Sequence, residues 1–115
     1  SADEHRFGIH GGQVETAMML ALHPERVRMD RARDFASTSR DRSRRYPVLG
    51  NGRSAKLAWQ TQDYNAQGAV GNAAAADATL GRALVDAAGR SLAQLLQEFS
   101  QLPLSTLVDG PDLAG

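Results

Sequence analysis

The chain has 115 residues, 42% of them hydrophobic and 5% aromatic, and a formal net charge of zero, so we expect one domain with an aliphatic core. The absence of cysteine excludes a disulfide framework, a thiolate metal site and a cysteine nucleophile. No apolar run approaches the roughly 20 residues that span a bilayer, and the charged N-terminal stretch is unlike a signal peptide, so we expect a soluble cytoplasmic protein with no membrane partner.

The first predicted elements are a loop and a short helix. Residues 1–12 are expected to form a loop that ends in a Gly-Gly pair. A helix should follow, because apolar residues recur there at helical spacing, and it should end at Pro24, which disfavours helical geometry in the residue before it. Its apolar side chains are predicted to belong to the core, namely Met18, Met19 and Leu22.

The middle of the chain is basic and polar. Residues 25–56 carry ten bases and four acids, a net charge of +6. We expect a short strand or extended connection at residues 27–29 and a long surface loop over residues 31–54, whereas residues 55–59 suit either a helical turn or a strand. The interleaved acids and the scarcity of aromatic residues favour a solvated or intersubunit face, so we predict no nucleic-acid partner.

A long helix is predicted near the C-terminus, over residues 74–100. Seven apolar residues lie on one of its faces: Leu80, Leu84, Ala88, Leu92, Leu95, Leu96 and Phe99. Gly81 and Gly89 each cost about 1 kcal/mol relative to alanine in a helix, so we expect close backbone packing against another element at both positions. The two helices and few short extended segments leave apolar faces that need something else to pack against.

The stretch GIHGGQVETAMMLAL, residues 8–22, contains an H-G-G-x-x-E unit that simple packing does not require. Gly11 and Gly12 allow positive φ and the close approach of a ligand to the backbone. Glu15 lies in the first helical turn, where its carboxylate is favoured by the helix dipole and can be directed at a cation. His10 can reach the same cavity from the loop edge. One carboxylate and one imidazole are a minimum for metal-assisted hydrolysis, although the same residues can also cap a strand and a helix without any catalytic role.

Two stretches resemble the creatininase (creatinine amidohydrolase) family. HGGQVETAMMLALHPERV resembles the family segment in which a histidine, two small residues and a Glu-Thr pair open a helix. GAVGNAAAADATLGRALVDAAG is similar to the family's glycine loop and the Ala/Thr-rich start of the next helix, with Asn-Ala at residues 72–73 in place of the usual Asp-Pro. The resemblance implies a metal-dependent amidohydrolase with a three-layer α/β fold, two divalent ions such as zinc or manganese, and usually a hexameric assembly.

The resemblance also implies roles for individual residues. Glu15 corresponds to a metal ligand and His10 to a proton shuttle beside the metal-activated water, while Gly11 and Gly12 clear space for the substrate. Arg6 stands where creatininase has a tryptophan that closes over creatinine. We therefore expect a substrate other than creatinine, and an anionic group on it could meet Arg6.

Two motifs that carry the family's other metal ligands are missing from this sequence, E-x-H-G-x-H-L-P followed by an aspartate, and N-G-H-G-G-N. We therefore expect residues 1–102 to form the C-terminal portion of a creatininase-like α/β domain, followed by a tail at residues 103–115. A partner, either the N-terminal half of the same protein or a separate subunit, would supply the remaining ligands within a homo- or hetero-oligomer. The substrate would be a small amide or cyclic amide. The alternative is a non-catalytic interaction module that kept this half of the fold.

Overall fold

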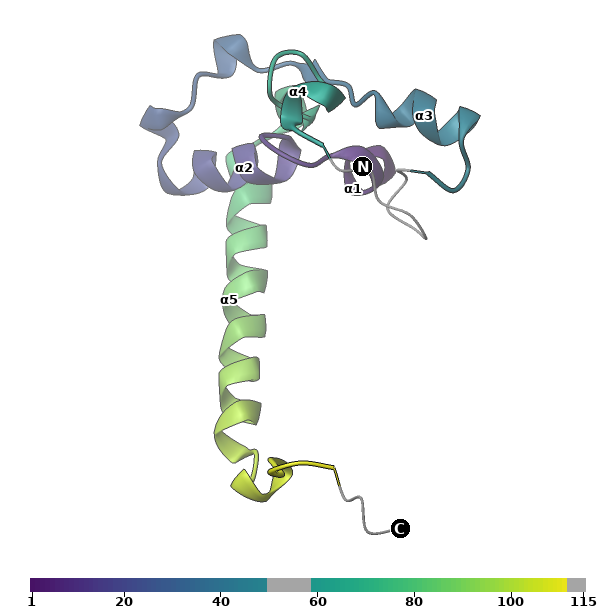
Figure 1. Cartoon of the computed structure of the whole chain (residues 1–115). Coiled ribbons are helices and arrows are strands. Elements are labelled where there is room, and N and C mark those ends of the chain that lie inside the picture. The colour runs from purple at the N-terminus through teal and green to yellow at the C-terminus, as the bar shows by residue number, and fades with distance from the viewer. Residues whose placement is uncertain (50–58, 112–115) are drawn as a thin grey trace. The chain divides into compact units, whose positions relative to one another are not determined.

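The computed structural model describes residues 1–49 and 59–111. It is mostly helical with one small antiparallel sheet, which is compatible with an α/β fold (Figure 1). The chain divides into two units, Ser1–Val85 and Asp86–Gly115. Within the described ranges, no helix combines the length and the apolar character that crossing a membrane requires.

The N-terminal segment begins with a helix, so the prediction of a continuous loop there is wrong. α1 spans Ala2–Phe7, and the Ser1 hydroxyl caps it by accepting a hydrogen bond from the Glu4 backbone N–H at 3.2 Å. His5 and Arg6 lie in the last turn, where positive charge is favoured by the helix dipole. A helix of six residues is too short for the hydrophobic periodicity on which the prediction relied.

The second helix forms where it is predicted, but the side chains predicted for its core face, Met18, Met19 and Leu22, are not buried. α2 spans Gln13–Leu22, and Pro24 begins the short 3-10 helix η1, Pro24–Arg26. Met19 is 39% exposed and Leu22 is 56% exposed, because the strands of this unit are too short to cover them. The buried apolar residues of the described chain are instead Ala17, Tyr64, Val70, Ala73 and Ala76.

The described part of the segment predicted as a long surface loop contains the last residue of one short element and the whole of two others. They are the 3-10 helix η2 (Met29–Arg31), the strand β1 (Asp34–Phe35) and the helix α3 (Ser39–Arg45). Residues 27–28 connect η1 to η2 and form no strand. Residues 50–54 of the predicted loop and all but the last residue of the segment 55–59 lie outside the described residues.

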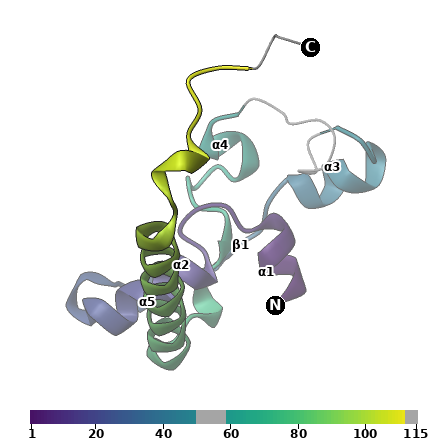
Figure 2. The same ribbon diagram turned by 90° about the horizontal axis from the view of Figure 1, so that it is seen from below.

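The sheet joins the middle of the chain to the glycine loop. β1 pairs antiparallel with β2 (Gly71–Asn72), so that Asp34 lies opposite Asn72 and Phe35 opposite Gly71. β2 contacts α1, which lies beside the sheet (Figure 2). The short helix α4 (Thr61–Tyr64) is held to the segment before α3, because the Tyr64 carbonyl accepts a hydrogen bond from the Thr38 backbone N–H at 2.8 Å.

The long helix α5 spans Ala78–Gln101. It therefore begins four residues later than predicted. Ala73–Ala75 form the 3-10 helix η3 instead. Asp77 then marks the helix start, because its side-chain oxygen accepts hydrogen bonds from the backbone N–H groups of Thr79 and Leu80 at 2.8 and 2.9 Å.

The two glycines of α5 differ in their surroundings. A Cβ at Gly81 would overlap the Ala17 carbonyl and lie 2.9 Å from the Ala21 Cβ, which confirms the predicted close packing of α5 against α2 at this position. At Gly89 the prediction is wrong for the described part of the chain, because an added Cβ there would meet nothing within 4 Å.

The second unit consists of the rest of α5 and the 3-10 helix η4 (Leu104–Thr106). Its large apolar side chains are exposed: Leu92, Leu95, Leu96, Phe99, Leu102, Leu104, Leu107 and Val108. The apolar face predicted for this helix therefore lacks a covering element among the described residues of this unit.

Candidate active site

The two stretches that carry the family resemblance meet in space through a pair of backbone hydrogen bonds. The His10 N–H donates to the Val70 carbonyl at 3.2 Å, and the Val70 N–H donates to the His10 carbonyl at 2.7 Å. Val70 is fully buried, so this bridge is anchored in the core of the unit. The backbone of the H-G-G turn is thereby fixed against the glycine loop.

His10 and Glu15 lie close together on this turn. His10 Nδ1 is 3.8 Å from Glu15 Oε1, and their side chains are 64% and 48% exposed. The other Glu15 oxygen accepts a hydrogen bond from the Gly12 backbone N–H at a long 3.4 Å. An ion pair this exposed contributes little to stability, so both side chains are accessible to a ligand at small energetic cost.

The two glycines between His10 and Glu15 are favoured for different structural reasons. Gly11 has a φ of +63°, a left-handed conformation that side chains other than glycine rarely adopt. Gly12 is buried, and a Cβ there would overlap a Glu4 carboxylate oxygen and lie 3.0 Å from the Gly71 Cα. Close packing within the protein therefore accounts for Gly12, and the predicted substrate role of both glycines stays a prediction.

Glu15 borders two hollows of the surface. One, of about 240 Å³, lies between α1 and the start of α2 and also includes His5 and Ile9. The other, of about 250 Å³, also includes Gly11, Met19, Arg26 and Arg28. Sequence reasoning missed Arg26 and Arg28, because nothing in their local pattern separates them from the other arginines of the basic segment.

Arg6 lies on a different hollow, which it shares with Arg40 and Ser43. Its guanidinium is 4.9 Å from the centroid of the Phe7 ring, over which it stacks. Arg6 lines neither of the two hollows that border Glu15, so contact between Arg6 and a substrate held at Glu15 remains a prediction.

Glu4 is a buried carboxylate that sequence reasoning missed. It is 9% exposed, and its oxygens accept hydrogen bonds from the backbone N–H groups of Gln13 at 2.6 Å and Asn72 at 2.8 Å. The Asn72 side chain caps η3 by accepting a hydrogen bond from the Ala75 N–H at 3.2 Å, which gives the departure from Asp-Pro a structural role. In the sequence, Glu4 belongs to a charged stretch that resembles a solvated loop.

A complete metal site is not formed by the described residues. No group of three histidine, cysteine, aspartate or glutamate side chains within them could hold a metal ion. Residues 50–58 contain none of these four residue types. His23 lies at the far end of α2, where its ring is 3.3 Å from Glu25. Glu15 can offer one carboxylate and His10 one imidazole, which is fewer groups than the three protein ligands of a typical hydrolytic zinc site.

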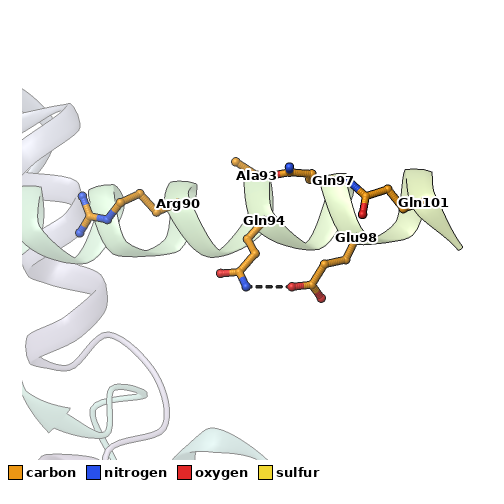
Figure 3. Close-up of a pocket in the computed structure, with 6 residues that line it drawn as sticks. All are labelled: Arg90, Ala93, Gln94, Gln97, Glu98 and Gln101. Carbon is orange, nitrogen blue, oxygen red and sulfur yellow. Dashed lines mark hydrogen bonds between the residues drawn. The ribbon is translucent and has the colours of Figure 1, made fainter.

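A further hollow lies on α5 and is lined by polar residues of that one helix (Figure 3). Within it, the Gln94 side-chain nitrogen donates a hydrogen bond to Glu98 at 2.8 Å. Amides and one carboxylate on a single helix face are typical of a solvated surface. We assign no chemistry to this hollow.

The comparison with protein families identifies the family of the chain. A family model described as creatinine amidohydrolase matches residues 1–96. The chain belongs to the creatininase family. The match includes both the His10–Glu15 turn and the glycine loop that holds it, and it indicates a hydrolase of the amidohydrolase kind. No curated protein and no solved structure matches the chain.

The basic segment of this creatininase-family chain makes many contacts within the protein. Arg40 lies 3.7 Å from Asp3 and 3.8 Å from Asp34, and Arg44 lies 3.4 Å from Asp41. Other arginines stack on aromatic rings, as Arg42 does over Tyr64 and Arg45 over Tyr46. Internal partners of this kind reduce the positive potential that a phosphate backbone requires.

We therefore expect the creatininase-family chain not to bind DNA or RNA near physiological salt, whatever the sequence of the nucleic acid. Filter binding with labelled DNA and RNA over a range of salt concentrations would measure this. The expectation fails if a signal weakens steeply with added salt and disappears when Arg42, Arg44 and Arg45 are neutralised.

Proposed function

We propose that this chain is the C-terminal portion of a cytoplasmic, metal-dependent amidohydrolase that hydrolyses a small amide or cyclic amide. The observation that carries the proposal is the accessible pair of His10 and Glu15, 3.8 Å apart with Glu15 at the edge of two hollows, in a chain of the creatininase family. Glu15 would hold one of two divalent ions, zinc or manganese, and His10 would move a proton.

His10 suits proton transfer for reasons of both chemistry and position. An imidazole gains and loses a proton near neutral pH, which makes it an effective general acid for a leaving nitrogen. The His10 backbone is fixed on both sides by its pairing with Val70, while its side chain is 64% exposed. The His10 backbone is therefore fixed beside Glu15, while its ring is free to turn toward a substrate held at Glu15.

A partner chain is part of the proposal, because the described residues offer too few ligands. The partner would carry the two missing histidine-rich motifs, as the N-terminal half of the same protein or as a separate subunit. Support comes from the exposed apolar side chains of α2 and α5, which include Leu22, Leu95 and Phe99. Burying a side chain of this size stabilises a protein by about 1.5–3 kcal/mol, so these faces favour a covering element. We propose a homo- or hetero-oligomer, with a hexamer as the family precedent.

The alternative function is a non-catalytic interaction module that uses the same exposed apolar faces. It is favoured by one observation, namely that no three metal-ligating side chains gather among the described residues. A module of this kind needs no stoichiometric metal. Metal analysis of the purified assembly therefore separates the two functions.

The test of the metal-ligand role is the variant Glu15→Ala. We expect it to lower the divalent metal content of the assembled protein, because it removes a carboxylate ligand while leaving the backbone turn intact. Elemental analysis by mass spectrometry would give the metal per chain. Glu98→Ala is the matched control, since Glu98 is an exposed glutamate on α5 that lines neither hollow beside Glu15 and accepts a hydrogen bond from Gln94. Wild-type metal content in Glu15→Ala would remove Glu15 from the site.

A further inference from the structure

We propose that Glu4 is the positioning residue of this site: its buried carboxylate ties the first turn of α2 to the glycine loop and leaves the Glu15 carboxylate free for a ligand. The inference rests on the proposed function, because that function gives His10 and Glu15 the chemistry for which they must be positioned. Glu4 itself contacts backbone groups and no reacting atom.

The hydrogen bonds of Glu4 connect three parts of the chain. The residue is on α1, one carboxylate oxygen accepts from the Gln13 N–H at 2.6 Å, and the other accepts from the Asn72 N–H at 2.8 Å. Gln13 is the first residue of α2, two residues before Glu15, and Asn72 lies two residues after Val70, the partner of His10. A buried carboxylate with two short N–H donors forms charge-assisted bonds, which are among the stronger hydrogen bonds in proteins.

Three glycines make room for this carboxylate. A Cβ at Gly12 would overlap Glu4 Oε1, and a Cβ at Gly71 would lie 2.8 Å from the same oxygen. A Cβ at Gly8 would lie 2.9 Å from the Glu4 Cδ. The Glu4 carboxylate therefore adds to the restrictions at these glycines, alongside the Glu4 backbone carbonyl at Gly8 and the Gly12 Cα and a φ of +145° at Gly71. The glycines of the H-G-G turn and of the glycine loop thus serve, in part, to admit Glu4.

Glu4 and Glu15 have different roles as hydrogen-bond acceptors at the start of α2. The first N–H groups of a helix need acceptors, and the helix dipole favours a negative charge there. Glu4 supplies a buried acceptor with a 2.6 Å bond, whereas Glu15 supplies a half-exposed acceptor with a 3.4 Å bond to Gly12. The first turn of α2 therefore keeps its main acceptor when the Glu15 carboxylate turns toward a ligand. Glu4 holds the turn, and Glu15 is free to move.

Amide hydrogen exchange at single-residue resolution tests this division without substrate or metal. The full chain is used in the assembly in which it purifies. Glu4→Gln keeps the size of the side chain but replaces one acceptor oxygen with an NH₂ group that faces an N–H donor. We expect the amide of Gln13 or Asn72 to exchange about 10- to 100-fold faster, the range for losing one bond to a charged acceptor. Asp3→Asn, an exposed neighbour on α1, is the matched control and should change neither amide.

A second readout reports on the site itself. The chain has three histidines, so selective ¹⁵N labelling gives three imidazole signals in NMR spectra. We expect Glu4→Gln to shift or broaden the His10 signal at constant pH, an effect that a purely structural role away from the site would not produce. Glu15→Gln should change the His10 signal and the Gly12 amide but leave the Gln13 and Asn72 amides protected.

The inference is overturned if Glu4→Gln leaves both amides and the His10 signal as in the wild type, or if Glu15→Gln exposes the Gln13 and Asn72 amides. If Glu4→Gln does not fold, the wild-type protein decides: its Gln13 and Asn72 amides should exchange at least about tenfold more slowly than that of Gly12, and equal rates would contradict the division of roles. Because these measurements need no turnover, failure to find amide hydrolysis would refute the proposed function and leave this result standing.

Discussion

Replacing His10 with alanine should lower the turnover number of the assembled enzyme by about 10²- to 10⁴-fold, the range for loss of a general acid–base group. The fold should survive, because His10 is held by its backbone pairing with Val70 and its side chain is exposed. Metal content should stay near that of the wild type, since Glu15 and not His10 is the proposed ligand. Steady-state kinetics on an amide substrate and elemental analysis measure the two quantities.

The control for this variant is His23→Ala. His23 is the histidine at the other end of α2, where it pairs with Glu25. Turnover in His23→Ala should match that of the wild type. The proton-transfer role is wrong if His10→Ala keeps its activity, and it is unproven as a specific role if His23→Ala loses as much.

The second large effect is expected at Gly81, where alanine should destabilise the first unit. The added methyl group would overlap the Ala17 carbonyl, so α5 and α2 would have to move apart. Overpacking of this kind costs about 1–3 kcal/mol and sometimes more. Thermal unfolding of the assembled protein, followed by circular dichroism, would show a lower transition temperature.

Gly89 provides a matched control on the same helix. An added Cβ at Gly89 meets nothing within 4 Å in the described chain, so Gly89→Ala should raise stability by up to about 1 kcal/mol through helix propensity alone. Changes of opposite sign at the two glycines are the expected result. Equal stabilisation by both variants would mean that α5 does not pack on α2 at Gly81.

The sequence was informative where a local signal decides the structure. The span of α2 and its end before Pro24 follow from apolar periodicity and the effect of proline on the preceding residue. The spacing of His10 and Glu15 across a glycine turn indicated that the two side chains lie close together, and they are 3.8 Å apart, whereas a cavity common to both stays a prediction. Gly81 was predicted to mark a close helix contact because glycine is costly in a helix, and it does.

Other features depend on residues that are distant in the sequence. Glu4 was missed because its role appears only when residues 13 and 72 are known to lie beside it. β1 and β2 have two residues each, too few for an alternating pattern to be seen. Periodicity also identified Met19 and Leu22 as apolar but not what covers them, and in this chain they are exposed.

Whether a partner completes the site is tested most directly by expressing the 115-residue chain alone and together with a partner that carries the two missing motifs. Bound divalent metal per chain, oligomeric size, cooperativity of unfolding and amide hydrolysis are measured for both preparations. We predict that the chain alone aggregates or folds poorly and holds no stoichiometric metal, and that co-expression restores folding, metal binding and hydrolysis. A soluble, cooperatively folded monomer that binds two divalent ions and hydrolyses amides unaided would contradict this account.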